Sequence, residues 1–405
     1  MRFNVRFLQT GAKADAARHL EDLQSSPEGR TIMHPKMSHY LVHLDDLDTR
    51  AANILKQNML SIGGEVSLPR NVFEFKGETA SAIISGTRRQ FKTLIPKLAY
   101  QPFGLRTLQA ELIALFDSLD ASEHGRILKL HGREYGLSEA TLVMGILNIT
   151  PDSFSDGGQF YERDRAVEHA LRMVEEGADI LDVGGESTRP GAEAISEEEE
   201  LDRVIPVIEG IRRSVEVPIS IDTSKSGVAR LALDAGADML NDVSALRIDL
   251  GIAELAAERA VPLCLMHMLG MPKTMQVSPE YGDLMGEIIA FLRERAEAAA
   301  EAGVEPGNIL VDPGIGFGKT VAHNLEILRR LQELRGLGYP VLIGPSRKSF
   351  IGRVLNLPER ERLEGTAASV ALSIANGADI VRVHDVKEMV RVAGLADAIV
   401  GKPGK

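Results

Sequence analysis

The stretch "MGILNITPDSFSDGG", residues 144–158, passes abruptly from apolar to small polar side chains. Residues 144–149 are mostly Met, Ile and Leu, which is typical of a strand buried on both faces. Residues 150–158 combine Thr, Asp and Ser with Pro151 and two glycines, a composition typical of a loop. The pattern therefore predicts a core strand that ends near Asn148 and runs into a polar loop.

The same order of apolar run, polar loop and amphipathic helical pattern recurs along the rest of the chain. Eight apolar runs follow it, at residues 141–149, 179–185, 218–223, 238–244, 262–268, 308–315, 340–346 and 379–386. Apolar strands that alternate with helices indicate a parallel sheet covered on both faces. Eight such units predict the α/β class and a (β/α)8 barrel, or TIM barrel. A doubly wound open sheet is the alternative, because order along the chain does not show closure.

The N-terminal part of the chain has a different pattern. Helical candidates at 14–23, 48–60, 87–100 and 105–119 mix with short strands around "YLVHL" (40–44) and "VFEFKG" (72–77). We therefore predict a small α+β domain of unknown role over residues 1–120 and a barrel over residues 126–405. The segment "DASEHG" (120–125) is the expected linker between them.

The composition is that of an ordinary soluble globular protein, with 44% hydrophobic and 26% charged residues. No apolar run reaches membrane-spanning length, and the first residues lack the apolar stretch of a signal peptide. The net charge of -12 disfavours non-specific nucleic-acid binding. The single cysteine, Cys264, lies in an apolar run and is expected to be buried packing rather than a nucleophile. We expect a cytoplasmic protein with neither nucleic-acid nor membrane partners.

Polar residues stand at or just after the C-terminal end of every apolar run, where the functional groups of such barrels gather. They are Asn148, Asp182 with the loop 184–190, Asp222 with Thr223, Asn241 with Asp242, His267, Asp312, Arg347 to Ser349, and Arg382 to His384. Polar groups at the ends of buried strands are costly unless they bind one another or a ligand. Each one could be a structural hydrogen bond or cap, but together they predict a binding site.

The residue types in this ring suggest what the site would bind. The carboxylates and the amide, suited to a flat heterocycle with several N–H groups, are Asp222, Asn241 and Asp312. The cationic donors, suited to an anion, are Arg189, Lys348, Arg382 and His384. The segment "PGIGFGKT" is not a nucleotide-binding P-loop, because Pro313 stands where that motif requires its first Gly.

Arg382 and His384 alternate on the last apolar run, "DIVRVHDV". A period of two places both side chains on one side of the sheet, which we predict to be the barrel interior. The alternative is that Arg382 pairs with an acidic neighbour such as Asp385 and only stabilises the barrel.

Several longer segments together resemble the ordered motifs of dihydropteroate synthases. They are "MGILNITPDSFSDGG", "DVGGESTRPGA", "ISIDTSK", "NDVSA", "LMHMLGMPKTMQ", "DPGIGFGKT", "GPSRKSFIG" and "VRVHDV". The resemblance covers residues 126–405 and leaves residues 1–125 outside it. It implies a transferase of folate biosynthesis that condenses (7,8-dihydropterin-6-yl)methyl diphosphate with 4-aminobenzoate, releasing diphosphate and 7,8-dihydropteroate.

The resemblance also implies a role for each matching position. Residues that would hold the pterin are Asp222, Asn241, Asp312 and Lys348. Met266 and Phe317 would be apolar walls, one for the pterin and one nearer the 4-aminobenzoate. Asn148 would be a ligand of Mg2+ on the diphosphate, whose oxygens Arg382 and His384 would bind. Residues that would shape the 4-aminobenzoate pocket are Thr188, Arg189 and Ser349. Residues with a catalytic part would be Asn148, Arg189, Lys348, Arg382 and His384, and the enzyme would be a homodimer.

Two other functions remain open at this point. A methyltransferase of the methyltetrahydrofolate type shares the Asp and Asn contacts to a pterin but has no diphosphate to bind. A non-catalytic pterin-binding protein would keep the pocket without the reaction.

Overall fold

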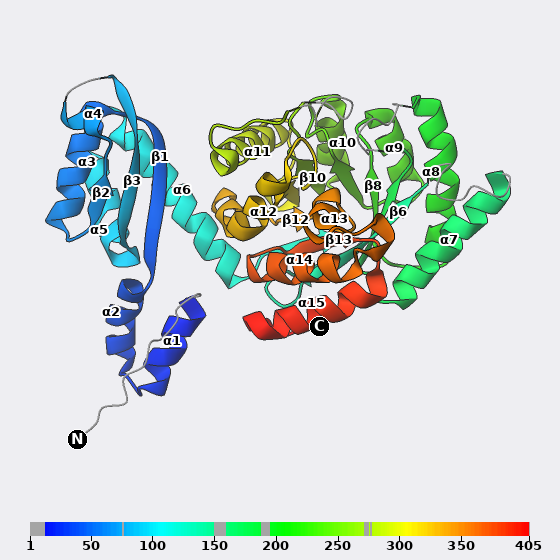
Figure 1. The fold of residues 1–405 in the computed structure, drawn as a ribbon, viewed down its shortest axis with the longest axis horizontal. Helices are drawn as coiled ribbons and strands as arrows, with labels where there is room; N and C mark the ends of the chain where they lie inside the picture. Colours follow the sequence, from blue (N-terminus) through cyan, green and yellow to red (C-terminus); the bar gives the residue numbers. More distant parts are fainter. Residues whose placement is uncertain are drawn as a thin grey trace. The chain divides into compact units, whose positions relative to one another are not determined.

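The computed structural model describes residues 13–74, 77–149, 159–187, 195–270, 275 and 278–404. The chain divides after Phe116 into two compact units, and helix α6 (Leu105–His124) crosses that division (Figure 1). In the described part of the chain, no helix is both long enough and apolar enough to cross a membrane.

The larger unit contains a sheet of eight parallel strands (Figure 1). They are β6 (Leu142–Asn148), β7 (Ile180–Gly184), β8 (Ile219–Asp222), β9 (Met239–Asp242), β10 (Leu263–Met266), β11 (Ile309–Asp312), β12 (Leu342–Ile343) and β13 (Ile380–Val383). Each lies within one of the eight predicted apolar runs. The strand order is β11-β10-β9-β8-β7-β6-β13-β12, and a parallel bridge between Val311 and Val341 joins the two outer strands. The predicted barrel is therefore confirmed, and the open-sheet alternative is wrong.

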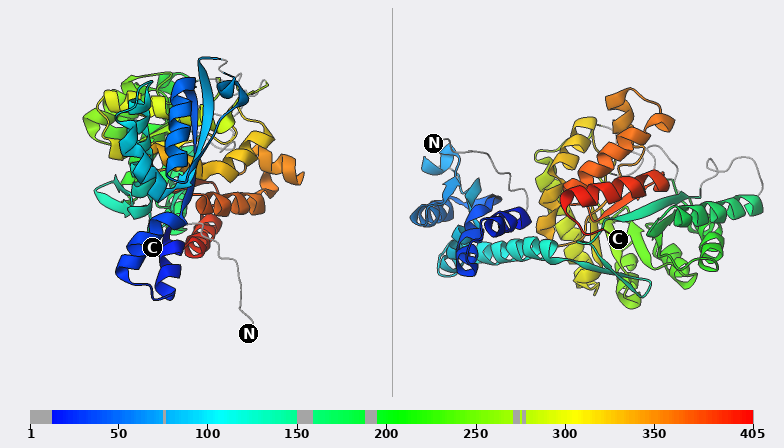
Figure 2. Two further views of the ribbon diagram at one scale, coloured as in Figure 1. Left: turned by 90° about the vertical axis from the view of Figure 1, so that its left-hand side faces the viewer. Right: turned by 90° about the horizontal axis from the view of Figure 1, so that it is seen from below.

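Helices surround the barrel and bury the outward side chains of its strands. They are α7 (Gln159–Glu175), α8 (Glu197–Arg212), α9 (Ser226–Asp234), α10 (Gly251–Arg259), α11 (Leu284–Glu301), α12 (Val321–Arg330), α13 (Ser349–Leu355), α14 (Leu363–Ala375) and α15 (Val386–Val400), with 3-10 turns at Pro306–Asn308, Leu331–Leu337 and Glu359–Glu361. Side-chain caps start two of them, since Ser196 accepts from the Glu199 N–H and Thr320 from the His323 N–H. Helices α14 and α15 pack side by side (Figure 2).

An apolar layer fills the lower interior of the barrel, that is, the part nearer the N-terminal ends of its strands. Inward side chains in this layer include Met144, Ile180, Met239, Cys264, Leu310, Leu342 and Ile380. The hairpin of β4 (Ile127–Leu130) and β5 (Arg133–Gly136) adds Leu128 and Leu130, which cover the N-terminal end of the barrel. Cys264 is a free and fully buried thiol within this layer. The inward positions nearer the strand C-termini are therefore the ones left for chemistry.

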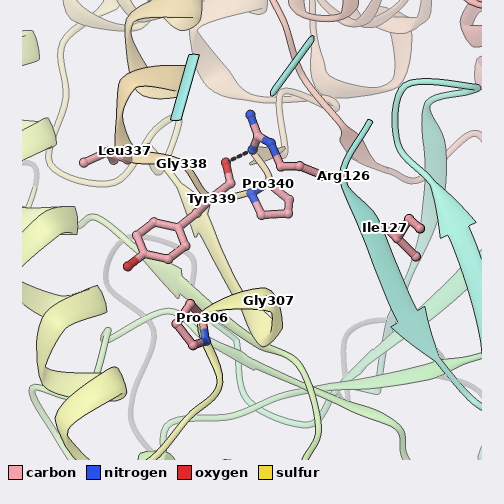
Figure 3. A pocket seen from close by; sticks show the side chains of 8 residues that line it. All are labelled: Arg126, Ile127, Pro306, Gly307, Leu337, Gly338, Tyr339 and Pro340. Atoms are coloured by element: carbon pink, nitrogen blue, oxygen red, sulfur yellow. Dashed lines mark hydrogen bonds between the residues drawn. The ribbon is translucent and has the colours of Figure 1, made fainter. Parts of the chain in front are cut away.

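A hollow lies at the N-terminal end of the barrel, opposite the polar strand ends (Figure 3). It lies between the start of β4 and the segments before β11 and β12, and Arg126 donates to the Tyr339 carbonyl there. The same guanidinium lies 3.7 Å from Asp379 Oδ2. Arg126 therefore anchors the hairpin to the barrel.

The smaller unit is a three-stranded antiparallel sheet of order β1-β3-β2, packed against helices, and confirms the predicted N-terminal α+β domain. Its strands are β1 (His39–Asp48), β2 (Glu65–Ser67) and β3 (Thr79–Thr87). Its helices are α1 (Lys13–Asp22), α2 (Pro27–Met37), α3 (Thr49–Ser61), α4 (Arg70–Phe73), α5 (Arg88–Leu98) and the first part of α6. Phe91 and Phe116 meet in its core with ring centroids 4.8 Å apart.

One local prediction in this region is wrong, and the expected linker has a conformation that its sequence did not indicate. The segment "VFEFKG" begins inside helix α4 rather than in a strand, and residues 75–76 lie outside the described part of the chain. Alternating apolar and polar residues over so short a stretch imitate a strand, but here Val72 is buried on one side of a helical turn. The expected linker 120–125 is mostly helical, because α6 continues to His124 and Gly125 is the first residue that stops it.

The turn of the β4–β5 hairpin is tied to the barrel by His131. Its Nδ1 lies 2.8 Å from Asp238 Oδ1 and its Nε2 lies 2.8 Å from Glu216 Oε2. Hydrogen bonds to these two carboxylates raise the pKa of His131 above its usual range. A group whose folded pKa is raised stabilises the fold below its unfolded pKa, and that stabilisation is lost as pH rises through the folded value.

We predict that His131→Gln lowers the stability of the barrel by on the order of 1 kcal/mol at pH 5.5 or so, and by clearly less near pH 9. Urea unfolding of parent and variant across this range measures the difference. His39→Gln on β1, which removes an exposed ring whose Nε2 lies 2.9 Å from Ser85 Oγ, is the control for loss of an exposed imidazole. A parent-to-variant difference that did not change with pH would contradict the prediction.

Candidate active site

The upper interior of the barrel, near the C-terminal ends of its strands, is polar. Every second residue of a strand points inward, and the last inward residue of most strands is polar. On β7, Ile180 lies in the apolar layer and Asp182 points into the next one; on β13, Ile380 and Arg382 are related in the same way. Inward positions in this upper layer are Asp182, Asp222, Asn241, Met266, Asp312 and Arg382. The structure thus brings together side chains from six strands at the C-terminal end of the barrel.

Arg382 lies at the centre of this layer. Its Nε is 2.5 Å from Asp182 Oδ2, and its Nη2 is 2.8 Å from Asp222 Oδ2. The two carboxylates outweigh burial and raise the pKa of the guanidinium, so it stays charged. The predicted inward orientation is confirmed. Arg382 also pairs with acidic residues, as the alternative predicted, but the partners are Asp182 and Asp222 rather than Asp385. Asp385 is bonded instead by Arg347, whose Nε lies 3.0 Å from its Oδ2.

Asp182 is more important to this network than its sequence suggested. The sequence places it in the ring of strand-end residues but assigns it no role. Its carboxyl is fully buried, accepts from Arg382 and lies 3.3 Å from the Asn241 amide nitrogen, and its Oδ1 has no hydrogen-bond partner among the described residues. The alternation Ile180, Asp182, Gly184 along β7 is the signal that could have identified an inward carboxylate.

Two of the inward carboxyls are easier to protonate than usual. Burial raises the pKa of Asp222, a shift that the nearby Asp182 reinforces and Arg382 opposes. Burial also raises the pKa of Asp312 to about 6, although its Oδ1 accepts from the Gly314 N–H at 2.6 Å. Both acids therefore titrate closer to neutral pH than free aspartate does.

An apolar wall stands beside Asp312. It consists of Met266, Met268, Met275 and Phe317, with Val243 against them. The Lys348 ammonium lies 4.2 Å from the centroid of the Phe317 ring, a cation–π distance. A side chain at Gly316 would begin 3.3 Å from Lys348 Cδ, and its φ of +85° also favours glycine. The wall and the ammonium can therefore pack closely.

His384 lies two residues after Arg382 and is therefore on the same side of the strand. Its Nδ1 lies 3.0 Å from Ser346 Oγ. Burial, together with the nearby Arg347 and Arg382, lowers the pKa of His384 to about 3. The ring is therefore neutral at physiological pH.

The remaining predicted residues lie at the rim or outside the described chain. Asn148 ends β6 and is half-buried, and a side chain at Gly184 would begin 3.7 Å from its Oδ1. Ser349 is the exposed first residue of α13. Thr188 and Arg189 lie outside the described residues.

One member of the predicted ring, His267, points away from the barrel interior. Met266 and Met268 take the inward positions, so His267 points outward, where its ring meets Phe291 edge to face at 4.9 Å. Its Nδ1 lies 2.9 Å from the Nζ of Lys319, a buried residue to which the sequence assigns no role. The pair ties the loop after β10 to the loop after β11.

Comparisons with known proteins agree with this site. A family model described as "Pterin binding enzyme" matches residues 144–384. A Bacillus subtilis dihydropteroate synthase is 52% identical over 277 residues, covering 68% of this chain and 95% of that protein. A structure of the Xanthomonas albilineans dihydropteroate synthase in complex with 7,8-dihydropteroate has a TM-score of 0.61 and 43% identity, and covers 67% of this chain and 98% of that one.

One relative extends further toward the N-terminus. A Halobacterium salinarum protein, described as a probable bifunctional folylpolyglutamate synthase/dihydropteroate synthase, is 44% identical over 384 residues. The match covers 95% of this chain and 46% of that protein. A match of this length is longer than the barrel unit and reaches into the N-terminal unit, which the Bacillus relative leaves uncovered. With a family model over more than half its length and relatives matched along almost their whole length, the chain belongs to the dihydropteroate synthases among the pterin-binding enzymes.

Proposed function

We propose that the barrel condenses (7,8-dihydropterin-6-yl)methyl diphosphate with 4-aminobenzoate, giving 7,8-dihydropteroate and diphosphate for folate biosynthesis. The observation that carries this proposal is one layer of inward side chains that holds a buried cation, Arg382, beside carboxyls suited to a heterocycle. A methyltransferase has no diphosphate to bind, so the cations Arg382 and Lys348 together with His384 favour the synthase. A non-catalytic binder would have no need of them either.

In this proposal the pterin lies between the Met266 and Phe317 wall and the carboxyl of Asp312. Asp312 Oδ1 already accepts from the Gly314 N–H, so Oδ2 is the oxygen that would accept from the pterin ring N–H and amino group. Asn241, Asp222 and Lys348 would complete the polar contacts to the ring. An apolar wall with a few convergent polar groups is the usual form of such a site.

Arg382 and His384 would hold the diphosphate. Because two carboxylates already orient the Arg382 guanidinium, its side chain needs little rearrangement to bind an anion. Asn148 offers one amide oxygen, and no group of three or more His, Cys, Asp or Glu side chains suited to a metal occurs in the described chain. Such a donor set fits Mg2+, which commonly takes few protein oxygens and completes its shell with substrate phosphates and water. When bound, Mg2+ would supply charge neutralisation on the diphosphate.

The reaction exchanges one bond for another at the exocyclic methylene carbon. The bond to the diphosphate oxygen breaks with both electrons on oxygen, a bond to the amine nitrogen forms, and that nitrogen then loses a proton. The conjugated pterin stabilises positive charge at the methylene carbon, which favours departure before attack. Arg382 and His384 would stabilise the leaving group, while Thr188, Arg189 and Ser349 would orient the 4-aminobenzoate.

Diphosphate release by the full chain, measured with the pterin diphosphate in the presence and absence of 4-aminobenzoate, tests the function directly. A synthase releases diphosphate at a steady rate only when both substrates are present. Binding of the pterin without turnover would instead identify a non-catalytic protein.

We predict that Asp312→Asn weakens pterin binding by roughly 2 kcal/mol or more. The amide oxygen of the variant would turn to the Gly314 N–H, which leaves the amide NH2 facing the pterin donors. In the parent, affinity should fall as pH drops through about 6, because only the ionised carboxyl accepts from two donors. Calorimetry with a diphosphate-free pterin measures both effects, with exposed Asp234→Asn as the control. Equal affinity of parent and variant would refute the assignment.

We predict that Arg382→Ala loses diphosphate affinity by about 2–5 kcal/mol, while the affinity for a diphosphate-free pterin hardly changes. The variant leaves Asp182 and Asp222 without their cation, so its thermal midpoint should also fall. Arg382→Lys, which keeps the charge but cannot bridge both carboxylates bidentately, should lie between parent and Ala. Inhibition by added diphosphate measures the affinity. A destabilised variant with parental diphosphate affinity would make Arg382 purely structural.

We also infer that the enzyme is a homodimer, while its cytoplasmic location stays a prediction. The dimer is supported by large apolar side chains exposed on the outer faces of α14 and α15: Leu372 at 59%, Leu395 at 66% and Ile399 at 76%. Apolar groups gathered on adjacent packed helices are typical of an interface between subunits.

We predict that the full chain is a dimer in light scattering at micromolar concentration and that Ile399→Glu shifts it toward monomer. The introduced charge would be desolvated at a dimer interface and solvated in the monomer. Leu231→Glu, at a half-exposed apolar position on α9, is the matched control and should remain dimeric. A monomeric parent would contradict the inference.

A further inference from the structure

A single buried hydroxyl contacts His384 at two atoms. The Oγ of Ser346, a residue in the turn after β12 that is 3% exposed, accepts from the main-chain N–H of His384 at 3.2 Å. The same Oγ lies 3.0 Å from His384 Nδ1. The strand end that carries the imidazole is therefore held by a neighbouring strand's turn.

The two contacts decide where the imidazole carries its proton. The ring is neutral, so either Nδ1 or Nε2 bears the hydrogen. With hydrogen on Nδ1, Ser346 Oγ would accept from both the His384 backbone N–H and Nδ1–H. The hydrogen of the buried hydroxyl could then no longer be donated to Nδ1. With hydrogen on Nε2, the hydroxyl accepts from the backbone N–H and donates to Nδ1, which satisfies the hydroxyl, the backbone N–H and Nδ1. Burying an unpaired donor is costly, so the second arrangement is the stable one.

We propose that Ser346 is a positioning residue that holds neutral His384 in the tautomer with hydrogen on Nε2. This leaves Nε2–H as a donor for the diphosphate, beside the Arg382 guanidinium. The inference rests on the diphosphate site of the proposed function and goes beyond it, because it assigns the direction of the donor. The opposite tautomer would present a lone pair to the anion and repel it.

The turn around Ser346 is held so firmly that the hydroxyl cannot simply follow a rotated ring. Arg347, at φ +56°, donates its N–H to Thr366 Oγ1 at 3.1 Å, and its carbonyl accepts from Arg362 Nη1 at 2.9 Å. Its guanidinium pairs with Asp385, the residue after His384. The turn after β12 and the end of β13 therefore form one rigid clamp around the imidazole.

A neutral His384 ring offers the diphosphate a hydrogen bond without adding a further positive charge to the site. Arg382 already supplies a permanent positive charge, and Lys348 supplies another nearby. A second donor that is neutral before the anion binds adds a hydrogen bond to the diphosphate without repelling the other cations of the site. It would also let the product leave, since a neutral donor binds an anion less tightly than a cation does.

The test combines three variants with a spectroscopic measurement. The variants are Ser346→Ala, His384→Gln and the double variant, because the side-chain amide of Gln carries N–H groups at the place of Nε2 and needs no partner to orient a tautomer. Ser373→Ala, which removes a fully buried hydroxyl that donates to the Ser369 carbonyl within α14, is the matched control. Nitrogen-15 shifts of the His384 ring report the tautomer, and inhibition by free diphosphate reports its binding.

We expect the parent ring to carry its hydrogen on Nε2 and Ser346→Ala to give a mixture of tautomers. Ser346→Ala should weaken diphosphate binding by about two- to fivefold, because only the fraction of His384 rings that keep hydrogen on Nε2 binds the anion. In the His384→Gln background the same change should leave the affinity of that variant unchanged, and Ser373→Ala should leave the parental affinity unchanged.

The inference would be overturned by hydrogen on Nδ1 in the parent, by an unchanged tautomer in Ser346→Ala, or by an equal loss in both backgrounds. The last would mean that Ser346 contacts the anion directly or only supports the fold. Failure of the diphosphate site is distinguishable, because His384→Ala and Arg382→Ala would then bind diphosphate as the parent does whatever the tautomer. A parental diphosphate affinity in Ser346→Ala would also exclude the positioning role.

Discussion

The buried guanidinium of Arg382, held between Asp182 and Asp222, is the interaction on which the rest of the barrel mouth depends. Each of these three charges would be strongly disfavoured alone in the interior of a barrel. Together they form a triad that keeps the arginine charged, while burial raises the pKa of Asp222. Asn241 is linked to it through Asp182. The ring of polar strand ends is thus one coupled network.

That network can exist at one end of the barrel only because the other end is apolar and closed. The layer that contains Met144, Cys264 and Ile380 excludes water from below, and the β4–β5 hairpin covers it. Low polarity beneath the triad strengthens its hydrogen bonds and its attraction for an anion. The same low polarity raises the pKa of Asp312 and lowers that of His384, so the site combines the cations Arg382 and Lys348 with a neutral donor and a titratable acceptor.

The sequence predicted the barrel well because its strands are almost continuously apolar and each is followed by a polar loop. All eight strands lie inside the predicted runs, and the alternation on β13 correctly turned Arg382 inward. Prediction was weaker where the pattern was short. The segment 72–77 imitated a strand, and the expected linker was the end of a long helix. His267 lies at the end of a strand as the other ring members do, but its neighbours Met266 and Met268 point inward. The His267 side chain therefore points outward, which the sequence did not indicate.

The sequence by itself determined the order of strands and helices and the face on which each strand residue lies, because the period of two is a local property of the backbone. Its motifs also identified the family to which the chain belongs. Only the tertiary structure decided that the sheet closes through Val311 and Val341, and that Arg382 pairs with Asp182 and Asp222 while Asp385 pairs with Arg347. The physical reason is that ion pairs and pKa shifts depend on distances between strands remote in the chain, and those distances exist only after closure.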